Sequence, residues 1–169
     1  MIAMALASQP KLLIADEPTT ALDVTIQAQI LHLIHTLRQT RKMSILLITH
    51  NLGIVSQLAN RVAVMYAGQI VETGSTRSIL DTPSHPYTQA LLSSIPSVSS
   101  TSDQLHTIKG QVPLLNAMPS GCRFHPRCPL SQSECSKRSP LLSPMQSSSS
   151  SFPPHLCRCL LLNKSKHQL

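Results

Sequence analysis

The chain has 169 residues, enough for one domain of ordinary size, and a formal net charge of +7. Residues 1–95 carry six Lys and Arg against five Asp and Glu, whereas residues 96–169 carry eight against two, so the excess positive charge lies in the second half. The chain has two Phe, two Tyr and no Trp for base stacking, no apolar run as long as a membrane span and no signal peptide at its start, so we expect a cytosolic chain without a nucleic-acid partner.

Two short apolar runs, residues 11–16 and 44–49, are typical of strands covered on both faces of a parallel sheet. Between them, from about residue 25 to residue 42, apolar residues recur at helical spacing. This pattern predicts an amphipathic helix whose apolar stripe packs in the core and whose start is capped by Asp23 or Thr25. Strand, helix and strand form a βαβ unit, so both strands should end at the same edge of the sheet.

The rest of the first half predicts smaller elements. These are a short helix at 52–58, a hairpin at 61–74 and two small helices at 75–82 and 87–95, with His85 in a packing turn before the second. After residue 95 the sequence is rich in Pro and Ser and starts with a linker, so residues 96–169 should bury little apolar surface on their own. We therefore expect two parts, residues 1–95 and residues 96–169.

Charged side chains follow the two predicted strands. Asp16 and Glu17 close the first strand, and His50 follows the second. At such an edge an aspartate can hold Mg²⁺, a glutamate can orient or deprotonate a water that attacks a phosphoryl group, and a histidine can donate a hydrogen bond to the phosphate. Taken one at a time, these residues are better explained as caps, Asp16 and Glu17 of the following turn and His50 of the following helix.

The combination resembles a known family. "LLIADEPTTALD" resembles the Walker B strand, catalytic glutamate and D-loop of ATP-binding-cassette (ABC) ATPases, and "ILLITHNLGIV" resembles their switch-histidine segment. The resemblance implies an α/β fold, namely the C-terminal part of a P-loop NTPase domain, that acts on ATP with Mg²⁺. It also implies that Asp16 directs Mg²⁺, Glu17 is the catalytic glutamate, His50 is the switch histidine and Asp23 belongs to the D-loop, through which a second, homologous ATPase subunit pairs.

The sequence departs from the family in what it lacks. It contains neither the phosphate-binding G-x-x-x-x-G-K-S/T nor Leu-Ser-Gly-Gly, while Thr20 replaces the usual Ser and Asn51 the common Asp. Because Met1 falls where the family has just passed that signature, we expect a C-terminal part of an ATPase subunit that is inactive alone. The competing interpretation is a truncated, catalytically inactive remnant with at most an interaction role.

The second half narrows the resemblance. "SHPYTQALLSSIP", "IKGQVPLL", "MPSGCRFHPRCPL" and "CSKRSP" resemble the C-terminal extension of dipeptide and oligopeptide importer ATPases, in the peptide and nickel group. This implies a mostly irregular, Cys-rich extension on a subunit that uses ATP to import peptides. The implied partners are transmembrane permease subunits and, indirectly, a solute-binding protein. The implied location is the cytoplasmic face of the inner membrane, as a peripheral subunit.

All five cysteines lie in the second half. Cys122, Cys128, Cys135 and Cys157 have the spacing C-x5-C-x6-C-x21-C, and four thiolates suit zinc or an iron–sulfur cluster. The spacing is not that of a zinc ribbon. Some members of the importer group that the chain resembles are described as carrying an iron–sulfur cluster at matching cysteines, so the resemblance favours a cluster over zinc. Cys159 is expected to be dispensable. Free or buried thiols are the alternative.

Overall fold

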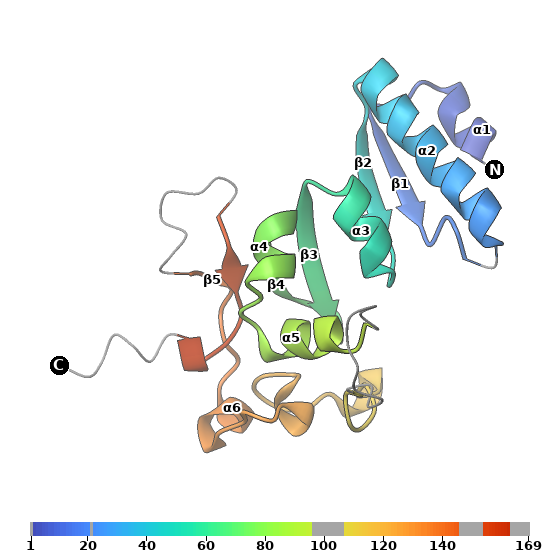
Figure 1. Ribbon diagram of the computed structural model, residues 1–169. Coiled ribbons are helices and arrows are strands. Elements are labelled where there is room, and N and C mark those ends of the chain that lie inside the picture. The colour runs from blue at the N-terminus through green and yellow to red at the C-terminus, as the bar shows by residue number, and fades with distance from the viewer. Residues whose placement is uncertain (1, 21, 96–106, 146–153, 163–169) are drawn as a thin grey trace, which may run out of the picture. The chain divides into compact units, whose positions relative to one another are not determined.

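The computed structural model describes residues 2–20, 22–95, 107–145 and 154–162 (Figure 1). These residues form a mixed α/β structure, and the chain divides into two compact units, Met1–Ala59 and Asn60–Leu169. Within the described ranges, none of the helices has the length and apolar character needed to cross a membrane. The predicted linker at 96–104 lies outside the described residues.

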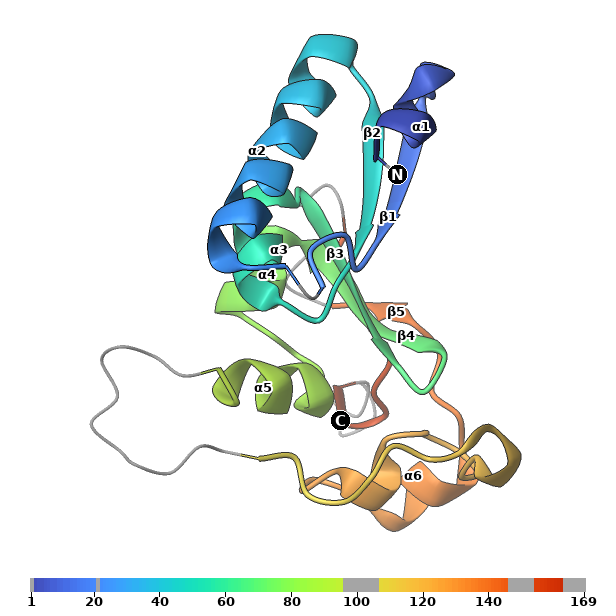
Figure 2. The ribbon, with the colours of Figure 1, turned by 90° about the vertical axis from the view of Figure 1, so that its right-hand side faces the viewer.

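The first unit contains the predicted βαβ arrangement. β1 and β2 pair in parallel from Leu12↔Ser44 to Asp16↔Ile48, and α2 runs beside them (Figure 2). The prediction of two parallel strands that end at one edge is therefore confirmed. The elements of this unit are α1 (Ile2–Ala7), β1 (Leu12–Asp16), α2 (Val24–Arg41), β2 (Ser44–Ile48) and α3 (Leu52–Leu58).

Side-chain caps fix where the helices of this unit begin. The Asp23 carboxylate accepts a hydrogen bond from the Ile26 N–H at 2.9 Å, so Asp23 rather than Thr25 caps α2. Asn51 caps α3 by accepting from the N–H groups of Gly53 and Ile54 at 3.0 and 3.4 Å. Both caps satisfy amide groups that have no partner inside the helix.

Burial in this unit differs from the expectation. Leu13 and Ala15 of β1 are buried, but the alternate residues Leu12 and Ile14 are 51% and 61% exposed. The prediction that both sheet faces are covered is therefore wrong for the described residues. In the apolar stripe of α2 only Ile34 is buried, which also corrects the expectation that the whole stripe is core. The physical reason is that a two-stranded sheet offers a single narrow face to one helix.

The second unit begins with the predicted hairpin and small helices, which are confirmed, and continues with elements that were not predicted. The hairpin turn is Ala67–Gly68, with φ angles of +47° and +77°, as in a two-residue type I′ turn. Its elements are β3 (Arg61–Tyr66), β4 (Gln69–Ser75), α4 (Thr76–Asp81), α5 (Pro86–Ser93), the 3₁₀ turns η1 (Leu115–Ala117) and η2 (His125–Arg127), α6 (Ser133–Lys137), β5 (Ser143–Pro144) and β6 (Leu156–Cys157).

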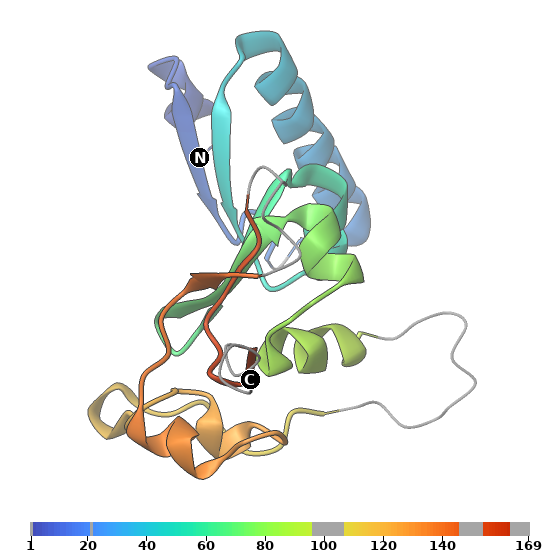
Figure 3. The ribbon, with the colours of Figure 1, turned by 90° about the vertical axis from the view of Figure 1, so that its left-hand side faces the viewer.

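The antiparallel sheet of this unit joins the hairpin to the end of the chain. Its order is β3-β4-β6-β5, so β4 has neighbours on both sides, and α5 lies between the hairpin and the segment that holds α6 (Figure 1, Figure 3). Because β6 pairs with β4, the hairpin and the later residues belong to one compact unit. The boundary between the two units along the chain therefore falls between residues 59 and 60. The boundary at residue 95, which separates sequence patterns rather than compact units, stays a prediction.

The core of the second unit is aromatic. Phe124, only 1% exposed, packs edge-to-face against Tyr66, with ring centroids 5.2 Å apart, and its ring centroid lies 5.3 Å from that of Tyr87. Val64, Val71 and Ile79 complete the buried cluster. Residues after 95 therefore bury apolar surface by joining the hairpin, which the composition of that half alone did not predict.

Candidate functional site

The structure brings Glu17 and His50 together at the carboxyl edge of the parallel strands. The Glu17 N–H donates to the Ile48 carbonyl at 2.9 Å, which extends the pairing one residue past β1. The His50 Nδ1 lies 2.7 Å from the Glu17 Oε1. The backbone of Glu17 has a φ of +46°, a left-handed conformation that is uncommon for a residue with a side chain. Two residues 33 positions apart in the sequence thus share one hydrogen bond.

A third side chain, Thr20, completes this arrangement. Its hydroxyl donates to the second carboxylate oxygen of Glu17, and its N–H donates to the Glu17 carbonyl at 3.1 Å, which closes a β-turn with Pro18 in the second position. No role for Thr20 was predicted from the sequence. The signal was the proline, because a turn of this kind returns the fourth residue to the first.

The electrostatics of Glu17 suit an ionised carboxylate. The hydrogen bonds from Thr20 and then His50 lower the pKa of Glu17 below its ordinary value. The side chains of Glu17 and His50 are 38% and 81% exposed, so the pair is open to solvent. A carboxylate of lowered pKa is a weak base but a good hydrogen-bond acceptor, so it can hold and orient a water molecule.

The two aspartates lie close to Glu17 in the sequence, Asp16 directly before it and Asp23 between Glu17 and His50. Asp16 is exposed and ends β1 opposite Ile48, at the same edge of the sheet as Glu17. The Asp23 carboxylate is engaged as the cap of α2. The edge therefore presents Asp16, Glu17 and His50 together, while Asp23 has a structural partner of its own.

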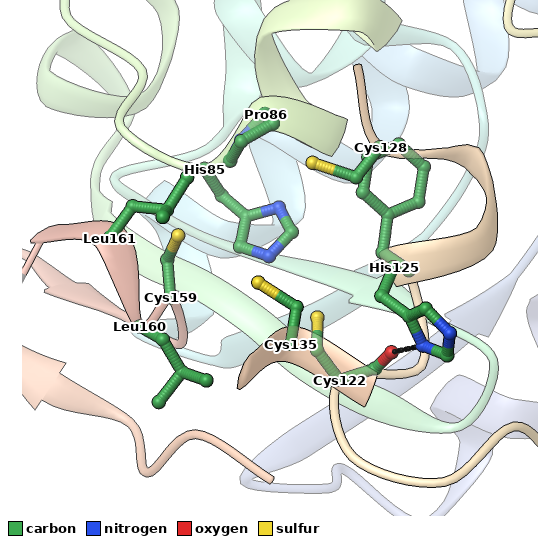
Figure 4. Close-up of a pocket in the computed structure, with 10 residues that line it drawn as sticks. His85, Pro86, Cys122, His125, Cys128, Cys135, Cys159, Leu160 and Leu161 are labelled. Carbon is green, nitrogen blue, oxygen red and sulfur yellow. Dashed lines mark hydrogen bonds between the residues drawn. The ribbon is translucent and has the colours of Figure 1, made fainter. Parts of the chain in front are cut away.

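A second cluster lies in the other unit, around a small cavity of about 20 Å³ (Figure 4). The thiols of Cys122, Cys128, Cys135 and Cys159 surround it together with the His85 ring. The His125 ring points away, with Nδ1 at 2.9 Å from the Cys122 carbonyl oxygen. The full lining is His85, Pro86, Cys122, Phe124, His125, Cys128, Cys135, Cys159, Leu160 and Leu161.

Cys157, predicted as the fourth ligand, does not line this cavity. It lies in β6, pairs in register with Glu72 of β4 and is buried in the sheet. Cys159, predicted to be dispensable, takes the place at the cavity. Residues two apart point to the same side of an extended strand, so the sequence could not separate these cysteines. What separates them is that β6 ends at Cys157.

Burial favours the neutral form of three of these thiols. It raises the pKa of Cys122, Cys128 and Cys159, and neighbouring thiols raise each of these pKa values further. A metal would therefore have to displace protons. Among the side chains that the structure describes, no group of three or more His, Cys, Asp or Glu is placed to hold a metal ion as it stands. The donor set nevertheless suits a soft metal, because thiols and an imidazole ring line the cavity and no carboxylate does.

Known proteins resemble this chain along most of its length. A family model described as "Oligopeptide/dipeptide transporter, C-terminal region" matches residues 71–135. A putative peptide import ATP-binding protein of Brucella melitensis is 53% identical over 156 residues, which are 92% of this chain and 47% of the relative.

Two further relatives give the same result. The oligopeptide transport ATP-binding protein AppD of Bacillus subtilis is 56% identical over 84% of this chain and 43% of its own length. The dipeptide transport ATP-binding protein DppD of Escherichia coli is 51% identical over 85% of this chain and 44% of its own length. The chain thus spans slightly less than half the length of each of these relatives.

Proposed function

We propose that the chain works as part of an ATP-hydrolysing subunit of a peptide importer. It is similar to ATP-binding proteins of peptide importers, and its residues 71–135 match the oligopeptide/dipeptide transporter C-terminal region. The observation that carries this proposal is the hydrogen bond between Glu17 and His50 at the carboxyl edge of parallel strands. Ligands of open α/β sheets bind at such edges.

The roles proposed for the residues follow from their positions. Asp16 would hold Mg²⁺, which when bound neutralises charge on the phosphates. Glu17, kept ionised by Thr20 and His50, would orient the attacking water. His50, one of whose ring nitrogens is bonded to Glu17, would donate to the phosphate from the other as charge develops there. The arrangement catalyses by positioning and electrostatics, as phosphoryl transfer requires.

The 169-residue chain should not perform this reaction by itself. Its sequence contains no G-x-x-x-x-G-K-S/T, the loop whose backbone amides and lysine hold the phosphates. The exposed apolar face of β1 and β2, with Leu12, Ile14, Leu46 and Ile48, supports the need for further polypeptide, because parallel sheets are normally covered on both faces. The alternative is an inactive remnant with at most an interaction role, and it too starts from the missing phosphate-binding loop.

The proposed partners follow from the importer relationship. They are transmembrane permease subunits, a homologous second ATPase subunit that pairs through the segment around Asp23, and indirectly a solute-binding protein. The proposed location is the cytoplasmic face of the membrane.

Calorimetry and complementation test the ATPase proposal. The chain alone should show no ATP binding, and micromolar affinity would contradict this. Co-expression with the part of the Bacillus subtilis relative that this chain does not match should restore MgATP hydrolysis. Glu17→Gln should then lower turnover by at least about 100-fold, as for a general base, and leave nucleotide binding intact. Glu134→Gln, which removes a charge from α6, is the matched control. A complemented protein without activity would favour the remnant.

We also propose that Cys122, Cys128, Cys135 and Cys159 bind a soft metal centre, an iron–sulfur cluster ahead of zinc. The observation that favours this second function is that four thiols and no carboxylate surround one cavity, a donor set that suits soft metals. Relative to the sequence prediction, Cys159 replaces Cys157, because only Cys159 faces the cavity. Such a centre would join residues 122–135 to the segment after β6.

Metal analysis of anaerobically prepared protein tests this assignment. The wild-type chain should contain iron and sulfide or, failing these, zinc. Cys159→Ala should lose the metal, and the matched variant Cys157→Ala should keep it. The reverse result would restore Cys157 as the ligand. A chain that never contains metal would identify these cysteines as ordinary packing residues.

A further inference from the structure

The carboxylate of Glu72 is fully buried in β4, where a charged residue is rare. Its oxygens are held by three N–H donors. Oε1 accepts from the Ser84 N–H at 2.6 Å and lies 2.7 Å from the His155 Nε2, and Oε2 accepts from the His85 N–H at 3.0 Å. A buried carboxylate needs such partners because it has lost its hydration. Glu72 therefore ties three chain segments to one point.

Two of these segments also border the thiol cavity. His85 lines it, and its Nδ1 accepts from the Tyr87 N–H at 3.0 Å, so the ring proton is on Nε2. The His85 ring also lies near the backbone of Arg158, next to Cys159. His155 stands four residues before Cys159. The Glu72 carboxylate thus holds two parts of the chain next to the cavity. One contains His85, which lines the cavity, and the other carries Cys159, the fourth thiol.

The backbone pairing of that segment is short. β6 has two residues, Leu156 and Cys157, paired with Thr73 and Glu72. Beyond them the Arg158 N–H donates to the Val71 carbonyl at 2.8 Å, and the Arg158 Nε donates to the Ile70 carbonyl at 2.8 Å. A strand this short gains little from its ladder, so the position of Cys159 depends on the Arg158 hydrogen bonds and on the side-chain anchor at Glu72.

We propose that Glu72 is a positioning residue that sets the Cys159 thiol at the cavity, by holding His155 and the His85 backbone with one carboxylate. The inference rests on the proposed function in that it treats the four thiols as one metal site. Three of the thiols belong to residues 122–135, and Glu72 couples them to the fourth. Its carboxylate does not line the cavity, so it acts through other residues.

Cobalt binding to the full chain tests this role, since Co²⁺ reports thiolate ligands by its charge-transfer absorbance. In Glu72→Gln the amide can accept at one end only, so contacts of the other oxygen are lost. We expect about three quarters of the wild-type absorbance per bound cobalt, as for three thiolates instead of four, and a loss of about 10-fold to 100-fold in affinity. Tyrosine fluorescence should stay native, because Tyr66 and Tyr87 lie in the folded core.

A pair of variants at His155 guards against a simple folding defect. His155→Gln keeps an N–H donor for Glu72 and should behave as wild type, whereas His155→Leu should lose the fourth thiolate. Asp81→Asn is the matched control, because Asp81 forms an exposed pair with Arg77, Nε to Oδ2 3.4 Å. A full four-thiolate spectrum in folded Glu72→Gln, or equal spectra for both His155 variants, would overturn the proposal.

Alkylation of the metal-free chain separates this proposal from the metal assignment. Mass spectrometry should show faster labelling of Cys159, relative to Cys135, in Glu72→Gln than in wild type. If wild type binds no cobalt but this labelling difference appears, the metal site is wrong and the positioning role stands. If wild type binds cobalt and neither spectrum nor labelling responds to Glu72→Gln, the positioning role is wrong and the metal site stands.

Discussion

Each unit of this chain contains a glutamate and a histidine joined over the same 2.7 Å, and the two pairs lie in opposite environments. Glu17 and His50 are 38% and 81% exposed at the end of a parallel sheet, whereas Glu72 and His155 are 0% and 8% exposed inside an antiparallel one. Water and ions can reach the first pair and cannot reach the second. The same two side chains thus suit chemistry at one site and anchoring at the other.

The difference follows from how each unit is layered. In Met1–Ala59 one long helix, α2, runs beside a sheet of two strands, and apolar residues such as Ile14 and Leu46 stay exposed. In Asn60–Leu169 the central strand β4 buries the neighbouring residues Val71 and Glu72 on opposite faces. Burial on both faces strengthens a satisfied polar network and makes its loss costly. The comparison therefore predicts unequal responses to equivalent substitutions.

The largest effect should come from breaking the buried pair. Glu72→Ala leaves His155 and two backbone N–H groups without their acceptor, which should lower the free energy of unfolding of the second unit by about 3–5 kcal/mol. Urea unfolding followed by tyrosine fluorescence measures this, because both tyrosines, Tyr66 and Tyr87, lie in this unit. Glu17→Ala should leave that transition unchanged. Equal effects of the two substitutions would end the distinction between the pairs.

The next effect concerns acid. Burial lowers the pKa of His85 from 6.5 to about 4, so between these values the unfolded metal-free chain binds a proton that the folded chain does not. Stability should therefore fall as the pH falls from 6.5 toward 4, by up to about 3 kcal/mol. His85→Asn still caps α5 but does not titrate. Denaturation at several pH values should show a smaller acid loss in this variant, and an equal loss would contradict the assignment.

A smaller effect is expected in the first unit, Met1–Ala59, where His50 directly precedes Asn51, the cap of α3. Asn51→Ala removes the acceptor of the Gly53 and Ile54 amides and should cost the helix about 1 kcal/mol. Hydrogen exchange at these two amides should accelerate about fivefold if they open locally. Gln39→Ala, on the exposed face of α2, is the control. Unchanged exchange would mean that the cap does not stabilise this end of the site.

The smallest effect should be a gain in the stability of the second unit, Asn60–Leu169. Ala67 holds a φ of +47° in the hairpin turn, a position that favours Asn. Ala67→Asn should raise the stability of the second unit by about 0.5 kcal/mol, seen as a higher urea midpoint. Gly68→Ala should lower it, because its φ is +77° and a Cβ there would lie 3.3 Å from the Arg123 Nη1. A loss with Ala67→Asn would indicate a different turn geometry.

The sequence by itself determined the local elements and the edge that carries the candidate site. Apolar runs and helical periodicity located β1, α2 and β2, and because a βαβ crossover makes strands parallel, Glu17 and His50 had to meet at one edge. A cap at Asp23 or Thr25 and the turn before β4 were likewise predicted from residue type, and the structure selects Asp23 as the cap. These features depend on neighbours within a few residues or on a fixed topology, so no further packing is needed to predict them.

Only the tertiary structure decided burial. Glu72 is one more charged residue of a hairpin strand until β6 pairs with β4, and Phe124 joins a core built mostly from residues far earlier in the chain. Cys157 and Cys159 differ in role because the strand ends between them. Ile14 is exposed because the face of β1 on which it lies is left uncovered. Burial depends on how many layers of helices and strands pack around a residue. The residue pattern of one segment does not reveal how many layers will pack against it.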